Sequence, residues 1–131
     1  MTLEKDLDFS GRRVLVTGAA NGFGAAMSRL FASRGASLVL ADIEADNVAT
    51  VARELGAEAH AFDQADAASI ERLAAAVGPV DILVNNAGML IAKSILDIEP
   101  AEIRRLIDTD FVGVVLMMRA FGRFMVERKR G

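Results

Sequence analysis

The chain has 131 residues, of which 53% are hydrophobic and 25% are charged, and its formal net charge is −3. This length suits one compact domain with a substantial core, and the composition excludes an intrinsically disordered chain. A weakly acidic balance offers no basic face to a phosphate backbone, so we expect no nucleic-acid partner.

The residue types that are absent narrow the function further. The longest uncharged apolar stretch, residues 111–118, is far shorter than the roughly 18 residues of a membrane helix, so we expect no membrane span. Acidic residues near the start, Glu4 and Asp6, are unlike a signal peptide and favour a cytoplasmic location. Without cysteine the chain has no disulfide or thiolate metal ligand, and we predict no metal site. Without tyrosine, a mechanism that needs a phenol base cannot run on this chain alone.

Short apolar runs alternate with longer segments of helical periodicity, which is typical of βαβ units and a parallel sheet. In chain order, we predict a strand and then a helix four times over, at residues 13–17, 22–34, 37–41, 45–55, 58–62, 67–77, 81–85 and 100–128. The order βαβαβαβα predicts an α/β fold of the Rossmann type, with a doubly wound parallel sheet. We expect one domain over residues 1–131 that is incomplete at its C-terminus, because the chain stops where another strand would begin.

The turn after the first strand, TGAANGFG, places glycines at positions 18, 22 and 24, a spacing that differs from G-x-G-x-x-G. Gly18 permits a tight exit from the strand, Gly22 lets the backbone approach a phosphate, and Gly24 allows the helix to pack closely on the strand. The free N–H groups of the following helix would face the anion. The alternative is a glycine-rich connection that only lets the helix pack, but the strand before it and the helix after it favour a nucleotide.

Asp42 closes the second predicted strand, where a carboxylate can accept hydrogen bonds from the adenosine ribose. A 2′-phosphate at about 4 Å would be repelled by about 4 kcal/mol at an effective dielectric constant near 20. No Arg or Lys lies close in sequence, so NAD is predicted in preference to NADP. The alternative is that Asp42 only caps the next helix.

Two further polar segments follow the third and fourth predicted strands. Asp63 suits either a hydrogen bond from an adenine amino group or an Asx turn, and its spacing alone does not decide between them. The segment Asn85-Asn86-Ala87-Gly88 suits a ligand crevice at the carboxyl end of the sheet, but two asparagines can also simply satisfy the backbone of a turn.

Together these motifs resemble the short-chain dehydrogenase/reductase family, in the subdivision marked by TGxxxGxG and NNAG, and the resemblance covers the whole chain. It implies an NAD-dependent oxidoreductase that, in complete form, transfers hydride between NAD(H) and a secondary alcohol or ketone. It assigns the cofactor to the following residues: Gly18, Asn21, Gly22, Phe23 and Gly24 at the diphosphate turn, Asp42 and Ile43 at the ribose, Asp63 and Gln64 at the adenine, and Asn85, Ala87 and Gly88 at the middle of the cofactor. The stretch 119–125 is similar to polyol dehydrogenases within that family.

The family's catalytic Ser, Tyr and Lys lie on elements beyond Gly131, so we expect this chain alone to be inactive. The alternative is a nucleotide-binding half-domain that performs no turnover. The resemblance also implies a homo-oligomer through the fourth helix. We expect association there, through the strand edge 82–84 and an apolar helix stripe of Leu106, Ile107, Val114, Met117 and Phe121.

One position departs from the family pattern. The family carries an Asn three residues before a Gly in the fourth helix, where it helps to hold a water in the proton relay, and this chain has Asp110 before Gly113. Asp110 is therefore a candidate catalytic residue. An ionised carboxylate there would raise the pKa of a neighbouring Tyr or Lys. The alternative is that Asp110 is a solvated carboxylate on the helix surface.

Overall fold

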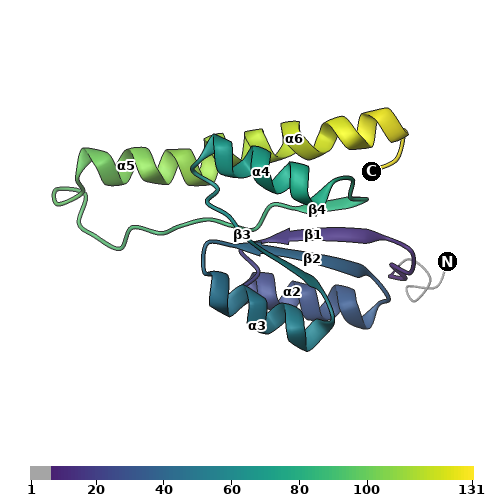
Figure 1. Ribbon diagram of the computed structural model, residues 1–131. Helices are drawn as coiled ribbons and strands as arrows, with labels where there is room; N and C mark the ends of the chain where they lie inside the picture. The colour runs from purple at the N-terminus through teal and green to yellow at the C-terminus, as the bar shows by residue number, and fades with distance from the viewer. Residues whose placement is uncertain (1–6) are drawn as a thin grey trace.

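The computed structural model describes residues 7–131, so Glu4 and Asp6 lie outside the described residues. It has four strands and five helical segments in α/β alternation (Figure 1). The strands are β1 (Arg13–Thr17), β2 (Ser37–Asp42), β3 (Glu58–Ala61) and β4 (Ile82–Val84). The helical segments are α2 (Gly22–Ser33), α3 (Ala45–Leu55), α4 (Ala67–Val77), α5 (Pro100–Ile107) and α6 (Gly113–Arg128), and a π-helical turn, η1 (Asp108–Val112), joins the last two.

The strands form one parallel sheet in the order β3-β2-β1-β4, which confirms the predicted Rossmann-type fold. The chain moves outward from β1 through β2 to β3 and then crosses back to place β4 on the other side of β1. The strand order therefore reverses between β1 and β4. In open α/β sheets, ligands bind at the carboxyl ends of the strands beside such a reversal.

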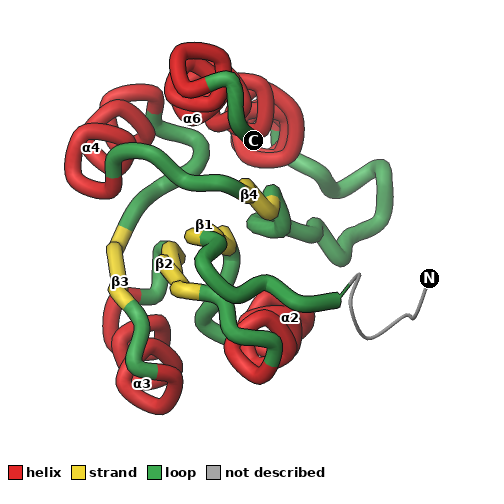
Figure 2. Tube along the Cα trace, turned by 90° about the vertical axis from the view of Figure 1, so that its right-hand side faces the viewer, coloured by secondary structure: helices red, strands yellow, loops and turns green. Residues whose placement is uncertain are grey.

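Helices cover both faces of the sheet, with α2 and α3 on one side and α4 and α6 on the other (Figure 2). Successive β1 side chains enter opposite cores. Val14 and Val16 pack in the core under α2 and α3, while Leu15 packs in the core that includes residues of α4 and α6. All three are fully buried. Burial on both faces explains why β1 is a continuous apolar run without alternation.

The predicted single helix over residues 100–128 is instead α5, the π turn η1 and α6. The widened turn lies where the helix meets the β3–α4 loop. A Cβ on Gly113 would lie 2.2 Å from the Gln64 backbone oxygen, so the two backbones approach too closely here for any side chain. Such π turns accommodate one extra residue without ending a helix.

The apolar stripe predicted for this long helix needs correction. Met117 and Phe121 are fully buried in the core, because this face of α6 packs towards α4 and the sheet. Of the other predicted members, Ile107 is exposed, and Leu106 and Val114 are partly buried. The exposed apolar side chains of this helical segment include Ile103, Ile107, Phe111, Val115 and Met118. The β4 edge, residues 82–84, is only partly buried. No helix within residues 7–131 is both long and apolar enough to cross a membrane.

Candidate functional site

A groove of about 500 Å³ opens at the carboxyl ends of the strands, between the glycine turn, the end of β2, the β3–α4 loop and the helix pair α5–η1. Most of the residues predicted to bind a cofactor line it: Gly18, Asn21, Gly22, Phe23, Asp42, Ile43, Asp63, Gln64, Ala87 and Gly88. Asn86, which belongs to the predicted NNAG segment, lines it as well. Five further lining residues were not predicted: Glu44, Phe62, Met89, Arg105 and Thr109.

The glycine turn presents an uncapped helix end to the groove. Gly18 and Gly22 have left-handed backbones, with φ of 63° and 52°. The N-cap of α2 is Asn21, whose side chain makes no capping hydrogen bond, so the first turn of α2 keeps free N–H groups. Gly24 does not line the groove but lets α2 touch the turn, because a Cβ there would lie 1.9 Å from the Gly18 oxygen. This arrangement suits an anionic group.

The glycine turn is fastened to the loop after β4 by two side chains. Asn86 Nδ2 donates to the backbone oxygens of Thr17 and Gly18 at 3.0 and 3.2 Å. Thr17 Oγ1 accepts hydrogen bonds from the backbone N–H groups of Asn86 and Ala87, both at 3.0 Å. Thr17 is fully buried. These contacts fix the two backbones that form the floor of the groove.

Of the two adjacent asparagines, Asn86 and not Asn85 reaches this groove. Asn85 instead lines a separate hollow beside the β4 edge and α6, where its buried Oδ1 has no hydrogen-bond partner within residues 7–131. Neighbouring residues at a strand end point to opposite sides. The sequence pattern alone could not decide which of the two amides faces the ligand side.

Asp42 joins the glycine turn to the start of the β2–α3 connection. Its Oδ2 accepts a hydrogen bond from Ala20 N at 2.9 Å, and its Oδ1 accepts one from Glu44 N at 3.0 Å. Glu44, and not Asp42, is the N-cap residue of α3, so Asp42 is not simply a helix cap. Each carboxylate oxygen can accept a further hydrogen bond, which keeps Asp42 able to bind a hydroxyl in the groove.

The charges along the groove are unequal. Glu44 adds a second carboxylate to the groove lining, and Asn21 Nδ2 donates to it at 3.5 Å. Among the described residues that line the groove, the one cationic side chain is Arg105 on α5. Arg105 pairs with Asp63 at 2.9 Å and, within residues 7–131, forms no ion pair with Asp42 or Glu44.

Asp63 is partly buried at the groove rim, where its Oδ1 accepts hydrogen bonds from Ala65 N and from Arg105, both at 2.9 Å. The first of these closes the Asx turn that the sequence allowed. Burial raises the pKa of the Asp63 carboxyl, but the hydrogen bonds from Arg105 and Ala65 outweigh it and hold the pKa below its ordinary value. The carboxylate is therefore ionised at neutral pH, so that it can accept a hydrogen bond from a ligand.

Gln64 connects three segments beneath the groove. Its Nε2 donates to the backbone oxygens of Ala87 at 3.0 Å and Thr109 at 2.8 Å. Two carbonyl partners require the amide nitrogen at this position, because the amide oxygen cannot donate. The side chain is only 4% exposed, and its Oε1 has no partner within residues 7–131. Gln64 therefore acts as a tie between the β4–α5 loop and η1.

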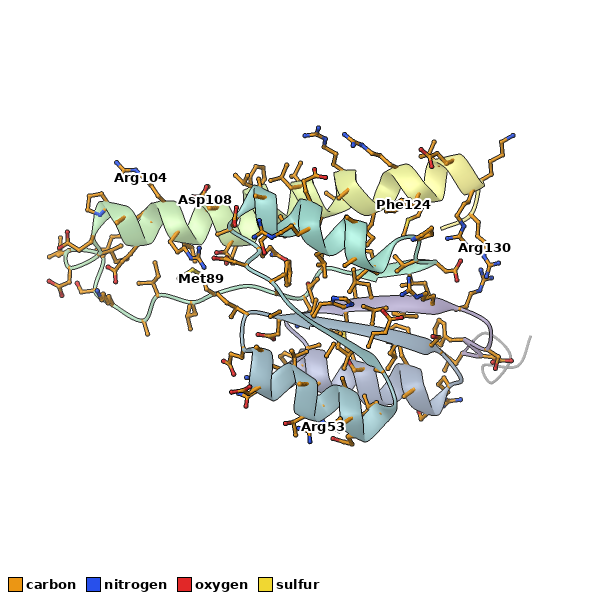
Figure 3. All side chains as sticks on the ribbon, viewed as in Figure 1. Arg53, Met89, Arg104, Asp108, Phe124 and Arg130 are labelled. Atoms are coloured by element: carbon orange, nitrogen blue, oxygen red, sulfur yellow. The ribbon has the colours of Figure 1, made fainter. Side chains whose placement is uncertain are left out.

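Asp110 does not line the groove. Its Oδ1 accepts a hydrogen bond from Met89 N at 2.9 Å, which anchors the loop after the NNAG segment to η1. Figure 3 shows Met89 below α5, at the inner side of this loop. The carboxylate is thus neither a purely solvated group nor part of the groove wall. Within residues 7–131 no cluster of His, Cys, Asp or Glu has the arrangement of a metal site.

A reversal of strand order, a glycine turn leading into an uncapped helix and an acid at the end of β2 define a Rossmann-type nucleotide-binding fold. The family model for short chain dehydrogenases matches residues 12–131. The chain therefore belongs to the short-chain dehydrogenase/reductase family, which implies an NAD(P) cofactor.

Known proteins similar to this chain support the same assignment. It is 40% identical to a D-threitol dehydrogenase of Mycolicibacterium smegmatis, over 98% of this chain and 54% of that protein. A structure of a putative betaketoacyl-ACP reductase aligns with a TM-score of 0.89 and 35% identity, over 95% of this chain and 53% of that one. A structure of a metagenomic short-chain oxidoreductase in complex with NADP aligns with a TM-score of 0.85 and 36% identity, over 94% of this chain and 60% of that one. The chain spans about half the length of the curated relatives it matches.

Proposed function

We propose that this chain is the cofactor-binding part of an NAD-dependent short-chain dehydrogenase/reductase, which in complete form acts on a secondary alcohol or ketone. The observation that carries the proposal is the uncapped N-terminus of α2, which opens into a groove whose other end holds Asp42 and Asp63. The uncapped N–H groups suit a diphosphate, and the carboxylates suit the hydroxyl and amino donors of adenosine.

The residues present fit a dinucleotide along the whole groove. A Cβ on Gly22 would meet nothing within 4 Å, so the backbone is open to an approaching phosphate. Asp42 is held by two backbone N–H groups and keeps accepting capacity for ribose hydroxyls. Asn86 and Thr17 hold the NNAG loop, and Ala87 and Gly88 line the middle of the groove. The bound nicotinamide supplies the hydride donor or acceptor, while these residues bind and orient the cofactor.

Preference for NAD is part of this proposal. Asp42 and Glu44 both line the ribose end, so a 2′-phosphate would meet two carboxylates. The NADP complex of the metagenomic relative shows that family membership alone does not decide between the two cofactors. For this chain the local charge favours NAD.

A second candidate function, nucleotide binding without turnover, is favoured by the absence of tyrosine from all 131 residues. The similar D-threitol dehydrogenase supports a polyol among the secondary alcohols considered for a complete enzyme. A cytoplasmic location stays a prediction from the acidic residues near the start of the chain, Glu4 and Asp6.

We also propose that the chain self-associates through the β4 edge and the exposed apolar side chains of α5, η1 and α6. Phe111, at the centre of that stripe, is 67% exposed. Light scattering at micromolar concentration should show a mass above that of the monomer, and Phe111→Asp should reduce it. A monodisperse monomer of the unaltered chain would count against association.

The binding proposal is tested by titrating the chain into NADH and following the nicotinamide fluorescence. Gly22→Asp places a carboxylate at the α2 terminus, and Gly56→Asp is the matched control, because both glycines have left-handed backbones and open space around the Cβ position. Gly22→Asp should weaken NADH binding by about tenfold or more through charge repulsion, and Gly56→Asp should leave it unchanged. Equal binding by the two variants would contradict a diphosphate site at α2.

A further inference from the structure

Arg105 joins α5 to the wall of the groove. α5 has no buried residue, and Figure 1 shows it extending beyond the sheet. The Arg105 guanidinium donates to Asp63 Oδ1 at 2.9 Å, with 42% of the Arg105 side chain and 33% of the Asp63 side chain exposed. The neighbouring Arg104 points away from the body of the fold in Figure 3. The Arg105–Asp63 pair thus lies at the rim, where it remains accessible to a ligand.

Both members of the pair keep unused hydrogen-bonding capacity. Asp63 Oδ1 already accepts from Ala65 N and from Arg105, but Oδ2 accepts no hydrogen bond within residues 7–131. A guanidinium carries five N–H donors, and Arg105 uses one of its nitrogen atoms in this contact. The pair therefore offers an acceptor and several donors side by side.

An adenine edge carries the complementary pattern, because the 6-amino group donates next to ring nitrogens that accept. Ile43 and Phe62 line the same end of the groove and supply apolar surface for a flat base. We propose that Arg105 is a specificity-determining residue that reads the adenine edge together with Asp63. Asp63 Oδ2 accepts from the 6-amino group, and Arg105 donates to the adjacent ring nitrogen. This inference rests on the proposed function, since it needs a dinucleotide in the groove.

A purely structural role gives a weaker account of the pair. Ion pairs as exposed as this one contribute little to the stability of a fold. A bound base would cover the pair and exclude water from it, which strengthens the hydrogen bonds that the two side chains make. The pairing also holds Asp63 in one orientation before the ligand arrives, which reduces the ordering needed on binding.

The test compares NAD with its 1,N6-ethenoadenine analogue, in which a bridge removes the 6-amino donor and the neighbouring ring acceptor. Binding of each to the chain is measured by calorimetry for the unaltered protein, for Arg105→Met and for Arg104→Met. Arg104→Met is the matched control, because it removes the same charge from the adjacent position of α5. Arg105→Met should weaken NAD binding about threefold to tenfold and ethenoadenine binding less than about twofold, whereas Arg104→Met should change neither.

The outcomes separate this inference from the function it rests on. If the unaltered chain binds NAD and Arg105→Met weakens both ligands equally, Arg105 acts only by holding α5, and the adenine reading is wrong. If Arg105→Met leaves NAD binding unchanged, Arg105 does not recognise adenine, but the groove is still a nucleotide-binding site. If the folded, unaltered chain binds neither ligand, the proposed function fails and this inference fails with it. Far-UV circular dichroism confirms that each variant is folded.

Discussion

The tie made by Gln64 can be tested by replacing it with Met, which has a similar length and no hydrogen-bonding amide. The substitution removes the donors to the Ala87 and Thr109 backbone oxygens and leaves both carbonyls without that partner. A net loss of about 1 kcal/mol for each hydrogen bond, with an added desolvation cost for a buried carbonyl, gives a total of roughly 3 to 5 kcal/mol. Removing the buried, unpartnered Oε1 stabilises the variant by about 1 kcal/mol, so we expect the free energy of unfolding to fall by about 2 to 4 kcal/mol.

Urea unfolding followed by circular dichroism measures this loss. Asn47→Met is the matched control, because Asn47 is an exposed amide on α3 that hydrogen-bonds only the exposed Glu44 side chain. The control should change the free energy of unfolding by less than about 0.5 kcal/mol. If Gln64→Met costs no more than Asn47→Met, the β4–α5 loop and η1 are not held together through this amide, and the reasoning is refuted.

Three further predictions address packing, charge and chemistry. Gly24→Ala should lower the stability by about 3 kcal/mol or more in thermal unfolding, because the new Cβ would lie 1.9 Å from the Gly18 oxygen. The control, Gly122→Ala, has open space in α6 and should be neutral or slightly stabilising. Similar melting temperatures for the two variants would contradict the close packing of Gly24 on Gly18. The hydrogen bond from Arg13 N holds the pKa of Asp81 below its ordinary value; Arg128 and Arg130 add to this effect, and burial opposes it. The ionised Asp81 carboxylate therefore stabilises the fold above about pH 4, and this stabilisation is lost as the pH falls through the lowered pKa. Asp81→Asn should therefore reduce the difference in the free energy of unfolding between neutral and acid pH. If the loss of stability at acid pH is the same in the variant, Asp81 is not the group responsible. The 131-residue chain, which has no tyrosine, should show no change in NADH absorbance with any alcohol or ketone, and turnover above a no-protein control would refute that expectation.

Periodicity and glycine placement were sufficient to predict the strand and helix order, because each βα unit is defined locally. β1 was recognisable as a doubly buried strand from its uninterrupted apolar residues, and both cores contact it as expected. The division of the last helix was not recognisable, since η1 lies where the helix contacts Gln64, a residue 45 positions before Thr109. Periodicity within the helix carries no trace of such a distant contact.

In the candidate site, too, residues that directly follow a strand could be predicted, and residues brought in by the tertiary fold could not. The glycine turn and Asp42 follow strands directly, so their place at the carboxyl end of the sheet could be predicted. Arg105 lies on α5, 42 positions after Asp63, and only the tertiary fold brings the two side chains together. Asn86 faces the groove and Asn85 faces the hollow beside α6, because successive side chains after β4 point to opposite sides. Two identical residues in a row give no sequence signal for which of them faces which side.

We expect the groove to bind a dinucleotide and its carboxylates to reject a 2′-phosphate. Calorimetric titration of the folded chain with NAD and with NADP, at the same pH and ionic strength, tests it most directly. Because Asp42 and Glu44 both line the ribose end, NAD should bind at least about tenfold more tightly than NADP, and added salt should narrow the difference. Equal or tighter binding of NADP, or no binding of either nucleotide, would contradict the account.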